Sequence, residues 1–228
     1  MIRSKGKFLF LAFLFNGILA NSRLDQKFND FWQKRLRPIK GVNRILNACK
    51  IFGGPRVQSM IGLILIYQKL TSPKTDNDQS WVSQALFNMA SCAIIKEISC
   101  GLLNGGRPVW QQTSLWRPFR WFKEQAERKA IPEPEKDKTN TNKHLRWKDG
   151  RAVSGHALMS SVMASVGTKA LDEFAKQYPS LSLVATVTKP ALVFSAIGCS
   201  LSRINDESHY LSQVIGGSAL GTAVMSYG

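Results

Sequence analysis

Several patterns that mark common fold classes are missing from this sequence of 228 residues. No stretch alternates apolar and polar residues long enough to argue for a β-sheet, and no segment of roughly 20–50 residues repeats. The apolar runs are short for bilayer spans, and the mean hydropathy of −0.14 argues against a protein with many spans. We therefore expect an all-α fold, a single helical bundle in a water-soluble protein.

Acidic residues are scarce, with 15 Asp and Glu against 31 Lys and Arg, which gives a net charge of +16. Residues 1–50 hold 11 of the basic residues and only 2 of the acidic ones. A basic arm of this kind attracts an anionic membrane surface, or a phosphorylated small molecule or lipid. Nucleic acid fits less well, because no zinc-finger or aromatic RNA-binding motif accompanies the charge. No cluster of Asp, Glu and His has metal-ligand spacing, so we expect no metal and no other cofactor.

The start of the chain has the composition of an export signal. Three basic residues precede an apolar run over residues 8–19, and the small residues Ala20 and Ser22 follow it. A signal peptide over residues 1–22 predicts an exported, periplasmic protein. The alternative is an uncleaved segment that anchors the protein to the membrane.

Four cysteines, Cys49, Cys92, Cys100 and Cys199, would meet an oxidising compartment if the chain is exported. Cys92 and Cys100 are eight residues apart in a predicted helix. That spacing separates them by about 12 Å along the helix axis, which is too far for a disulfide. Buried free thiols and bridges between other pairs are the remaining alternatives.

The spacing of apolar residues divides the rest into basic N-terminal helices over residues 23–70 and a helical bundle over residues 71–228. In the first part, an amphipathic helix over residues 22–37 begins with Ser22 and Asp25 as a capping box and ends before Pro38. It can lie on the domain or on a membrane. A short helix over residues 42–52 follows, and Gly53, Gly54 and Pro55 end it.

Two apolar segments, residues 57–70 and 81–103, are predicted to be buried bundle helices, because their apolar cores are too short to cross a bilayer. Residues 121–150 contain 14 charged residues out of 30 and are predicted to form an exposed loop in which His144 is solvated. Three further helices are expected, over residues 153–176, over 181–201 with an interruption at Lys189 and Pro190, and over 214–225.

One stretch of twelve residues, Ser202 to Gln213, concentrates the residues that can carry phosphate chemistry. The planar guanidinium of Arg203 offers a fork of donors that fits a phosphate, and His209 is a nitrogen nucleophile or acid near neutral pH. With Asn205 or Asp206 as a cap, a helix places His209 and Gln213 on one face. Gln213 can then bond one ring nitrogen of His209, which fixes its tautomer and frees the other nitrogen.

A second candidate piece is Val153-Ser154-Gly155-His156, at the start of an apolar helical run. Unpaired N–H groups at a helix start hold phosphate oxygens, with Ser154 as cap and Gly155 allowing close approach. His156 projects from the first turn.

Together these pieces resemble the second and third motifs of the type 2 phosphatidic acid phosphatase and vanadium haloperoxidase superfamily, written PSGH and SRxxxxxHxxxD. This chain has VSGH and SRxxxxxHxxxQ, and the resemblance extends over roughly residues 80–228. The first motif, KxxxxxxRP, is degenerate. Arg107 and Pro108 match its end, but Cys100 stands where the lysine belongs, and Lys96 lies four residues too early. Arg117 is a second candidate for the arginine.

The resemblance implies a metal-independent hydrolase of phosphate monoesters or diphosphates, including those of lipids. In the family's mechanism His209 would attack phosphorus to give a phosphohistidine, and His156 would protonate the leaving oxygen. Arg203, Arg107, Ser154, Gly155 and Lys96 would hold the phosphate. Gln213 in place of Asp can orient His209 but cannot offset an imidazolium charge.

Two other functions stay open at this stage. The same pocket in the family also takes vanadate as the cofactor of haloperoxidases, and a weakened site would leave a protein that only binds phosphate or anionic lipid. In each case His156, Arg203 and His209 must converge at one end of the bundle, with Arg107 pointing inward beside them.

Overall fold

The computed structural model describes residues 11–12, 14–71, 78–103 and 153–226, and every regular element within these ranges is a helix. The predicted all-α class is therefore confirmed. The predicted charged loop over residues 121–150 lies outside the described residues. In chain order the elements are α2 (Arg23–Phe31), the π-helix η1 (Trp32–Leu36), α3 (Lys40–Lys50), the 3-10 turn η2 (Ile51–Gly53), α4 (Pro55–Thr71), α5 (Asp78–Leu103), α8 (Gly155–Gln177), the 3-10 turn η6 (Pro179–Leu181), α9 (Ser182–Asn205) and α10 (Leu211–Ser226).

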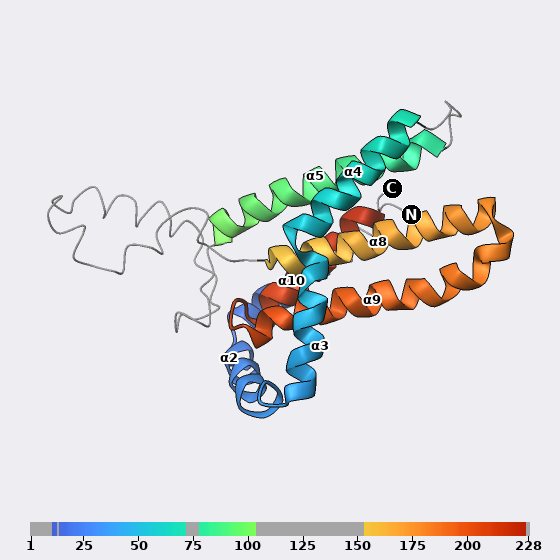
Figure 1. Cartoon of the computed structure of the whole chain (residues 1–228). Coiled ribbons are helices and arrows are strands. Elements are labelled where there is room, and N and C mark those ends of the chain that lie inside the picture. The colour runs from blue at the N-terminus through green and yellow to red at the C-terminus, as the bar shows by residue number, and fades with distance from the viewer. Residues whose placement is uncertain (1–10, 13, 72–77, 104–152, 227–228) are drawn as a thin grey trace, which may run out of the picture.

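Helices α8 and α9 form an antiparallel hairpin closed by η6, and α10 packs along α8 (Figure 1). Helices α4 and α5 run side by side over the other flank of α8. Helices α2 and α3 gather at the end of the bundle where α9 turns into α10, and α3 packs against α9. The start of α8 and the α9–α10 turn are thus surrounded by N-terminal helices.

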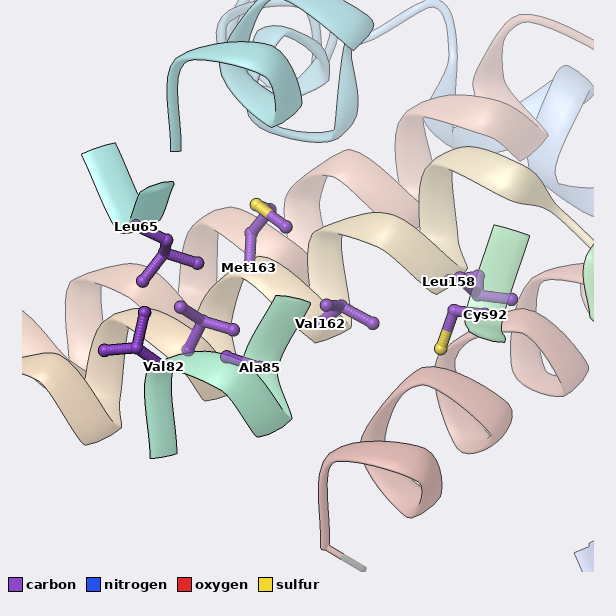
Figure 2. Packing of buried hydrophobic residues seen from close by; sticks show 8 residues of the cluster. Leu65, Val82, Ala85, Cys92, Leu158, Val162 and Met163 are labelled. Atoms are coloured by element: carbon purple, nitrogen blue, oxygen red, sulfur yellow. The ribbon is translucent and has the colours of Figure 1, made fainter. Parts of the chain in front are cut away.

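Two apolar clusters hold these helices together. The larger cluster joins α4, α5 and α8, and Figure 2 shows the side chains of Leu65, Val82 and Val162 within it. The smaller cluster lies under the α9–α10 turn, and its buried members are Trp32, Leu46, Ala157, Ile204 and Val214. Three of these residues, Ala157, Ile204 and Val214, directly follow His156, Arg203 and Gln213 in the sequence. Packing of the smaller cluster therefore fixes the backbone beside each predicted site residue.

The prediction that residues 57–70 and 81–103 form buried helices is wrong in part, because both are helical but neither is buried throughout. Among the side chains of α4 that the structure describes, only Leu65 is buried, whereas Leu63 is 66% and Tyr67 69% exposed. Helix α5 buries Val82 and Cys92 and exposes large side chains such as Phe87 and Ile94. Helices that are apolar on all sides carry no periodic signal of which side faces the core.

Helix α9 also differs from the prediction, because Pro190 lies inside one continuous helix and does not interrupt it. The segment Pro179–Asn205 has a mean hydropathy of 1.5 over its most apolar part, of which only 11% is buried. It is the one segment in the described ranges that is long and apolar enough to cross a membrane. Its exposed large side chains are Leu181, Leu183, Val184, Val187, Val193, Phe194 and Ile197.

The N-terminal segment lies on the domain. Ser22 caps α2 as predicted, but the carboxylate of Asp25 does not complete a capping box, since it binds Ser212 at the start of α10. Within the predicted signal region, residues 14–20 are helical and bury Asn16, Leu19 and Ala20. Asn16 lies against Gly216 of α10.

All four cysteines are free. Cys92, Cys100 and Cys199 are buried, in agreement with the alternative of free thiols. Burial raises the pKa of the Cys92 thiol to about 11, so this sulfur stays protonated at neutral pH and acts as a small apolar group.

The close contact between α10 and the start of α8 generates a stability prediction. A Cβ at Gly217 would lie 2.5 Å from the carbonyl oxygen of Ser154, and these are backbone atoms that cannot rotate away. We expect Gly217→Ala to lower the free energy of unfolding by about 1–3 kcal/mol, measured by urea denaturation. Gly62→Ala is the matched control, because a Cβ at Gly62 on α4 meets nothing within 4 Å. It should stabilise by up to about 1 kcal/mol through helix propensity. Equal effects of the two changes would contradict the packing argument.

Candidate active site

The start of α8 is built around Ser154, which is completely buried and serves as the N-cap. Its hydroxyl oxygen accepts a hydrogen bond from the Ala157 N–H at 3.4 Å, as the sequence predicts for a cap. Its own backbone N–H donates to the carbonyl oxygen of Gln213 at 2.7 Å. This bond joins the start of α8 to α10, so the two sequence motifs meet in space. The hydroxyl proton of Ser154 and the N–H groups of Gly155 and His156 remain the donors suited to an anion.

The turn between α9 and α10 folds back on Arg203. The carbonyl oxygen of Arg203 accepts from the N–H groups of Ser208 and His209, at 3.0 and 3.2 Å. Glu207 has a φ of +54°, a left-handed conformation that is uncommon outside glycine. This conformation reverses the chain in a few residues, so His209 returns to the level of Arg203.

Helix α10 begins at Leu211, after His209, and this corrects the predicted helix that carries both His209 and Gln213. Asn205 ends α9 and Asp206 is its C-cap, so neither caps α10 as predicted. The predicted hydrogen bond between His209 and Gln213 is nevertheless present, with Nδ1 and Oε1 separated by 3.0 Å. His209 is buried, and its ring lies just outside the helix that holds its partner.

The partner atom of His209 is an oxygen, because Oε1 of Gln213 also accepts from the backbone N–H of Tyr210 at 3.2 Å. A backbone N–H can only donate, so the amide orientation is fixed. Nδ1 of His209 must therefore carry the proton in the neutral ring. The lone pair is then on Nε2, which is the atom that can act as a base or nucleophile.

Arg203 is held by a carboxylate that the sequence analysis did not assign to the site. Nη1 of Arg203 lies 3.3 Å from Oδ2 of Asp206, and the side chain is 12% exposed. The same oxygen contacts Nζ of Lys50, on α3, at 2.5 Å. Nε of Arg203 is buried and has no hydrogen-bond partner among the described residues. A buried donor of this kind suits a bound anion.

His156 is half-buried beside these charges. Burial, most of all, and the positive charges of Arg203 and Lys50 lower its pKa to about 4, against the opposing effect of Asp206. In the empty site His156 is thus neutral at pH 7. The structure thus places Arg203 close enough to His156 for its charge to lower the pKa of that histidine. The carbonyl oxygen of Arg203 also accepts a hydrogen bond from the backbone N–H of His209.

Of the residues considered for the degenerate first motif, Lys96 and Cys100 lie close to the start of α8. Lys96 lies next to Gly155, since a Cβ on that glycine would be 3.4 Å from Cε of Lys96. Its ammonium, however, pairs with Glu97. Cys100 is buried, and its thiol donates to the carbonyl oxygen of Val153 at 3.7 Å, so the expected position of the lysine does abut the second motif. Arg107 and Arg117 lie outside the described residues.

A pocket of about 250 Å³ opens beside the start of α8. Gly155 and His156 form one wall, Lys96 and Glu97 of α5 a second, and Gln58 of α4 a third. His156 thus borders both this pocket and the charges around Arg203.

Three residues outside the predicted set hold the site together. Asp25 is fully buried and accepts from both the N–H and the hydroxyl of Ser212, which stabilises the start of α10. Lys50 and Asp206 have been described above. Of the three, only Asp206 could have been found from the sequence, because it lies between Arg203 and His209 in the same stretch. Asp25 and Lys50 reach the site through contacts between distant parts of the chain.

The comparisons with known proteins bear on the family of the chain. The sequence model of the PAP2 superfamily matches residues 81–227, which include the start of α8 and the α9–α10 turn. Searches of curated proteins and of solved structures find no match. A match to this superfamily implies a phosphatase-type function on phosphorylated substrates. The match covers more than half of the 228 residues, and the chain belongs to the PAP2 superfamily.

Proposed function

We propose that the chain is a phosphohydrolase that cleaves phosphate monoesters or diphosphates through a phosphohistidine on His209. The observation that carries this proposal is the hydrogen bond from Nδ1 of His209 to Gln213, because it leaves the lone pair on Nε2. A buried histidine in this tautomer is equipped to attack phosphorus. Arg203, whose carbonyl oxygen accepts from the His209 N–H, adds a buried guanidinium nitrogen that has no partner among the described residues.

In the first step Nε2 of His209 attacks phosphorus and the bond to the leaving oxygen breaks. His156 gives its proton to that oxygen, so the leaving group departs as an alcohol or a phosphate. Arg203, the Ser154 hydroxyl and the Gly155 N–H hold the three phosphoryl oxygens while their charge develops. In the second step water attacks phosphorus, the P–N bond breaks, and free phosphate leaves with His209 restored.

The proton on His156 has to arrive with the substrate. Its pKa of about 4 means that the empty site holds a neutral ring at pH 7. A bound phosphate brings negative charge, which raises the pKa of a nearby histidine and opposes the effect of Arg203 and Lys50. The protonated phosphate monoanion can therefore transfer its proton to His156 on binding.

Turnover of an aryl phosphate tests the proposed function. We expect the purified parent to hydrolyse it in the presence of EDTA and to be inhibited by vanadate, which mimics pentavalent phosphorus. His209→Asn should lose at least about 10³-fold in kcat/KM, because it removes the nucleophile. His144→Asn is the control, since His144 belongs to none of the three motifs. Activity that EDTA abolishes and magnesium restores would exclude this mechanism.

Gln213 gives a sharper test, through the series parent, Gln213→Asp and Gln213→Leu. A carboxylate stabilises the protonated ring of His209, so Gln213→Asp should move the acid limb of the pH dependence of kcat/KM to higher pH. Leu cannot orient the ring and leaves the Tyr210 N–H without its acceptor, so Gln213→Leu should lose more activity, by about 10- to 100-fold. If Gln213→Leu keeps the parent's rate and pH profile, Gln213 does not act through His209.

We also propose that the protein works at a membrane surface, in contact with anionic lipid. The exposed apolar side of α9 supports this, because large side chains such as Leu183, Val187 and Phe194 are exposed there and can enter the boundary between headgroups and acyl chains. Exposed apolar patches of this extent are rare on monomers that only meet water. The basic residues of the N-terminal 50 add attraction to anionic headgroups.

Cosedimentation with vesicles of phosphatidylcholine and phosphatidylglycerol tests this contact. Val187 and Phe194 are 66% and 70% exposed on α9, so changing both to Ser should leave the fold intact. We expect the double variant to bind vesicles at least about 10-fold more weakly, since two apolar side chains leave the lipid. Gln177→Ser, an exposed polar position, is the control. A parent that stays in the supernatant, or that buries this face in a dimer, would contradict the proposal.

A further inference from the structure

The carboxylate of Asp206 is shared by two cations from different parts of the chain. Arg203 approaches it from the end of α9 at 3.3 Å, and Lys50 approaches the same oxygen from the end of α3 at 2.5 Å. Lys50 lies before the segment that the family model matches, residues 81–227. The family resemblance therefore gives this lysine no role.

The charges around His156 do not balance. From α9 and its C-cap come Arg203 and Asp206, from α3 comes Lys50, and across the pocket Lys96 is neutralised by Glu97. Among the described residues, one carboxylate thus faces two cations, and one positive charge has no negative partner. Nε of Arg203, moreover, has no partner among the described residues although it is buried. An unbalanced charge and an unused donor at one place indicate an anion site.

The backbone of Lys50 is fixed while its ammonium can move. The thiol of Cys199 donates to the Lys50 carbonyl oxygen at 3.8 Å. Three residues further on, a Cβ at Gly53 would come within 2.7 Å of the carbonyl oxygen of His156. These contacts hold the end of α3 against the start of α8. The Lys50 side chain is 43% exposed, and its four-carbon stem lets the ammonium leave Asp206 for a nearby oxygen.

The position of the first-motif lysine is occupied by Cys100, whose thiol is committed to Val153, and the nearest lysine, Lys96, is committed to Glu97. We propose that Lys50 binds the substrate phosphate together with Arg203, in place of a first-motif lysine, and that Asp206 holds both cations in position while the site is empty. This inference rests on the phosphate site of the proposed function. It adds a residue from outside the family-matched segment to that site.

Direct binding of inorganic phosphate, measured by calorimetry on the full chain, tests the proposal without relying on turnover. Lys50→Met should weaken phosphate binding by about 10-fold or more, because it removes a charge-assisted contact. Lys50→Arg should stay within about 3-fold of the parent, since it keeps the charge. Lys40→Met, the same substitution ten residues earlier on α3, is the matched control and should change nothing.

The variant Asp206→Asn tests the proposal independently, because it leaves Lys50 in place. The proposal can therefore still be tested if Lys50→Met does not fold. Asp206→Asn removes the carboxylate that competes with phosphate, and we expect binding to tighten by about 3-fold or more. The pH dependence of kcat/KM should respond in opposite directions. Loss of the Lys50 charge raises the pKa of His156, and loss of the Asp206 charge lowers it further.

The outcomes separate this inference from the proposed function. Unchanged phosphate affinity in Lys50→Met or in Asp206→Asn, or an equal loss in Lys40→Met, overturns the role of Lys50 even if the parent hydrolyses aryl phosphates. A parent that binds phosphate but turns nothing over contradicts the proposed function, and Lys50 is then judged on binding alone. A melting temperature that falls in Lys50→Met with affinity intact shows a purely structural ion pair.

Discussion

The site depends on one backbone hydrogen bond, from the N–H of Ser154 to the carbonyl oxygen of Gln213. It ties the start of α8 to α10 and so brings the residue that caps one motif next to the residue that orients the histidine of the other. The bond is short, at 2.7 Å, because Gly217 lets the two backbones approach without an intervening side chain. This contact also fixes the distance between the start of α8 and the start of α10.

Around this bond, residues of the N-terminal helices bind the α9–α10 turn and the start of α10. Asp25 stabilises the start of α10, Gln33 donates its amide to the carbonyl oxygen of Ile204, and Arg37 pairs with Glu207. The turn, which contains the left-handed Glu207 and the buried His209, is hydrogen-bonded to residues of η1 and α3. Its geometry is therefore set by contacts with residues more than 160 positions away in the sequence.

Local patterns in the sequence predicted the parts of the site that local forces decide. The Ser154 cap follows from helix geometry and is present. The predicted hydrogen bond between His209 and Gln213 is present too, although His209 precedes the helix that carries Gln213, so the contact was predicted for a different backbone. The exposure of α4 could not be predicted, because an all-round apolar helix does not reveal which side packs. The hydrogen bond from Ser212 to Asp25 and the ion pair of Lys50 with Asp206 could not be predicted either, since they depend on how distant helices pack against each other.

The position of Lys50, Asp25 and Trp32 bears on where the functional unit begins. Sequence similarity marks a segment that starts at residue 81, and this segment contains every motif histidine and arginine. Cutting the chain at that boundary would remove the acceptor for Ser212, the indole that packs under Ile204 and donates to Asn205, and one of the two cations on Asp206. The segment that sequence similarity defines is therefore shorter than the set of residues that the fold of the site needs. The N-terminal residues hold the α9–α10 turn and the start of α10 in place, although they lie outside the matched segment.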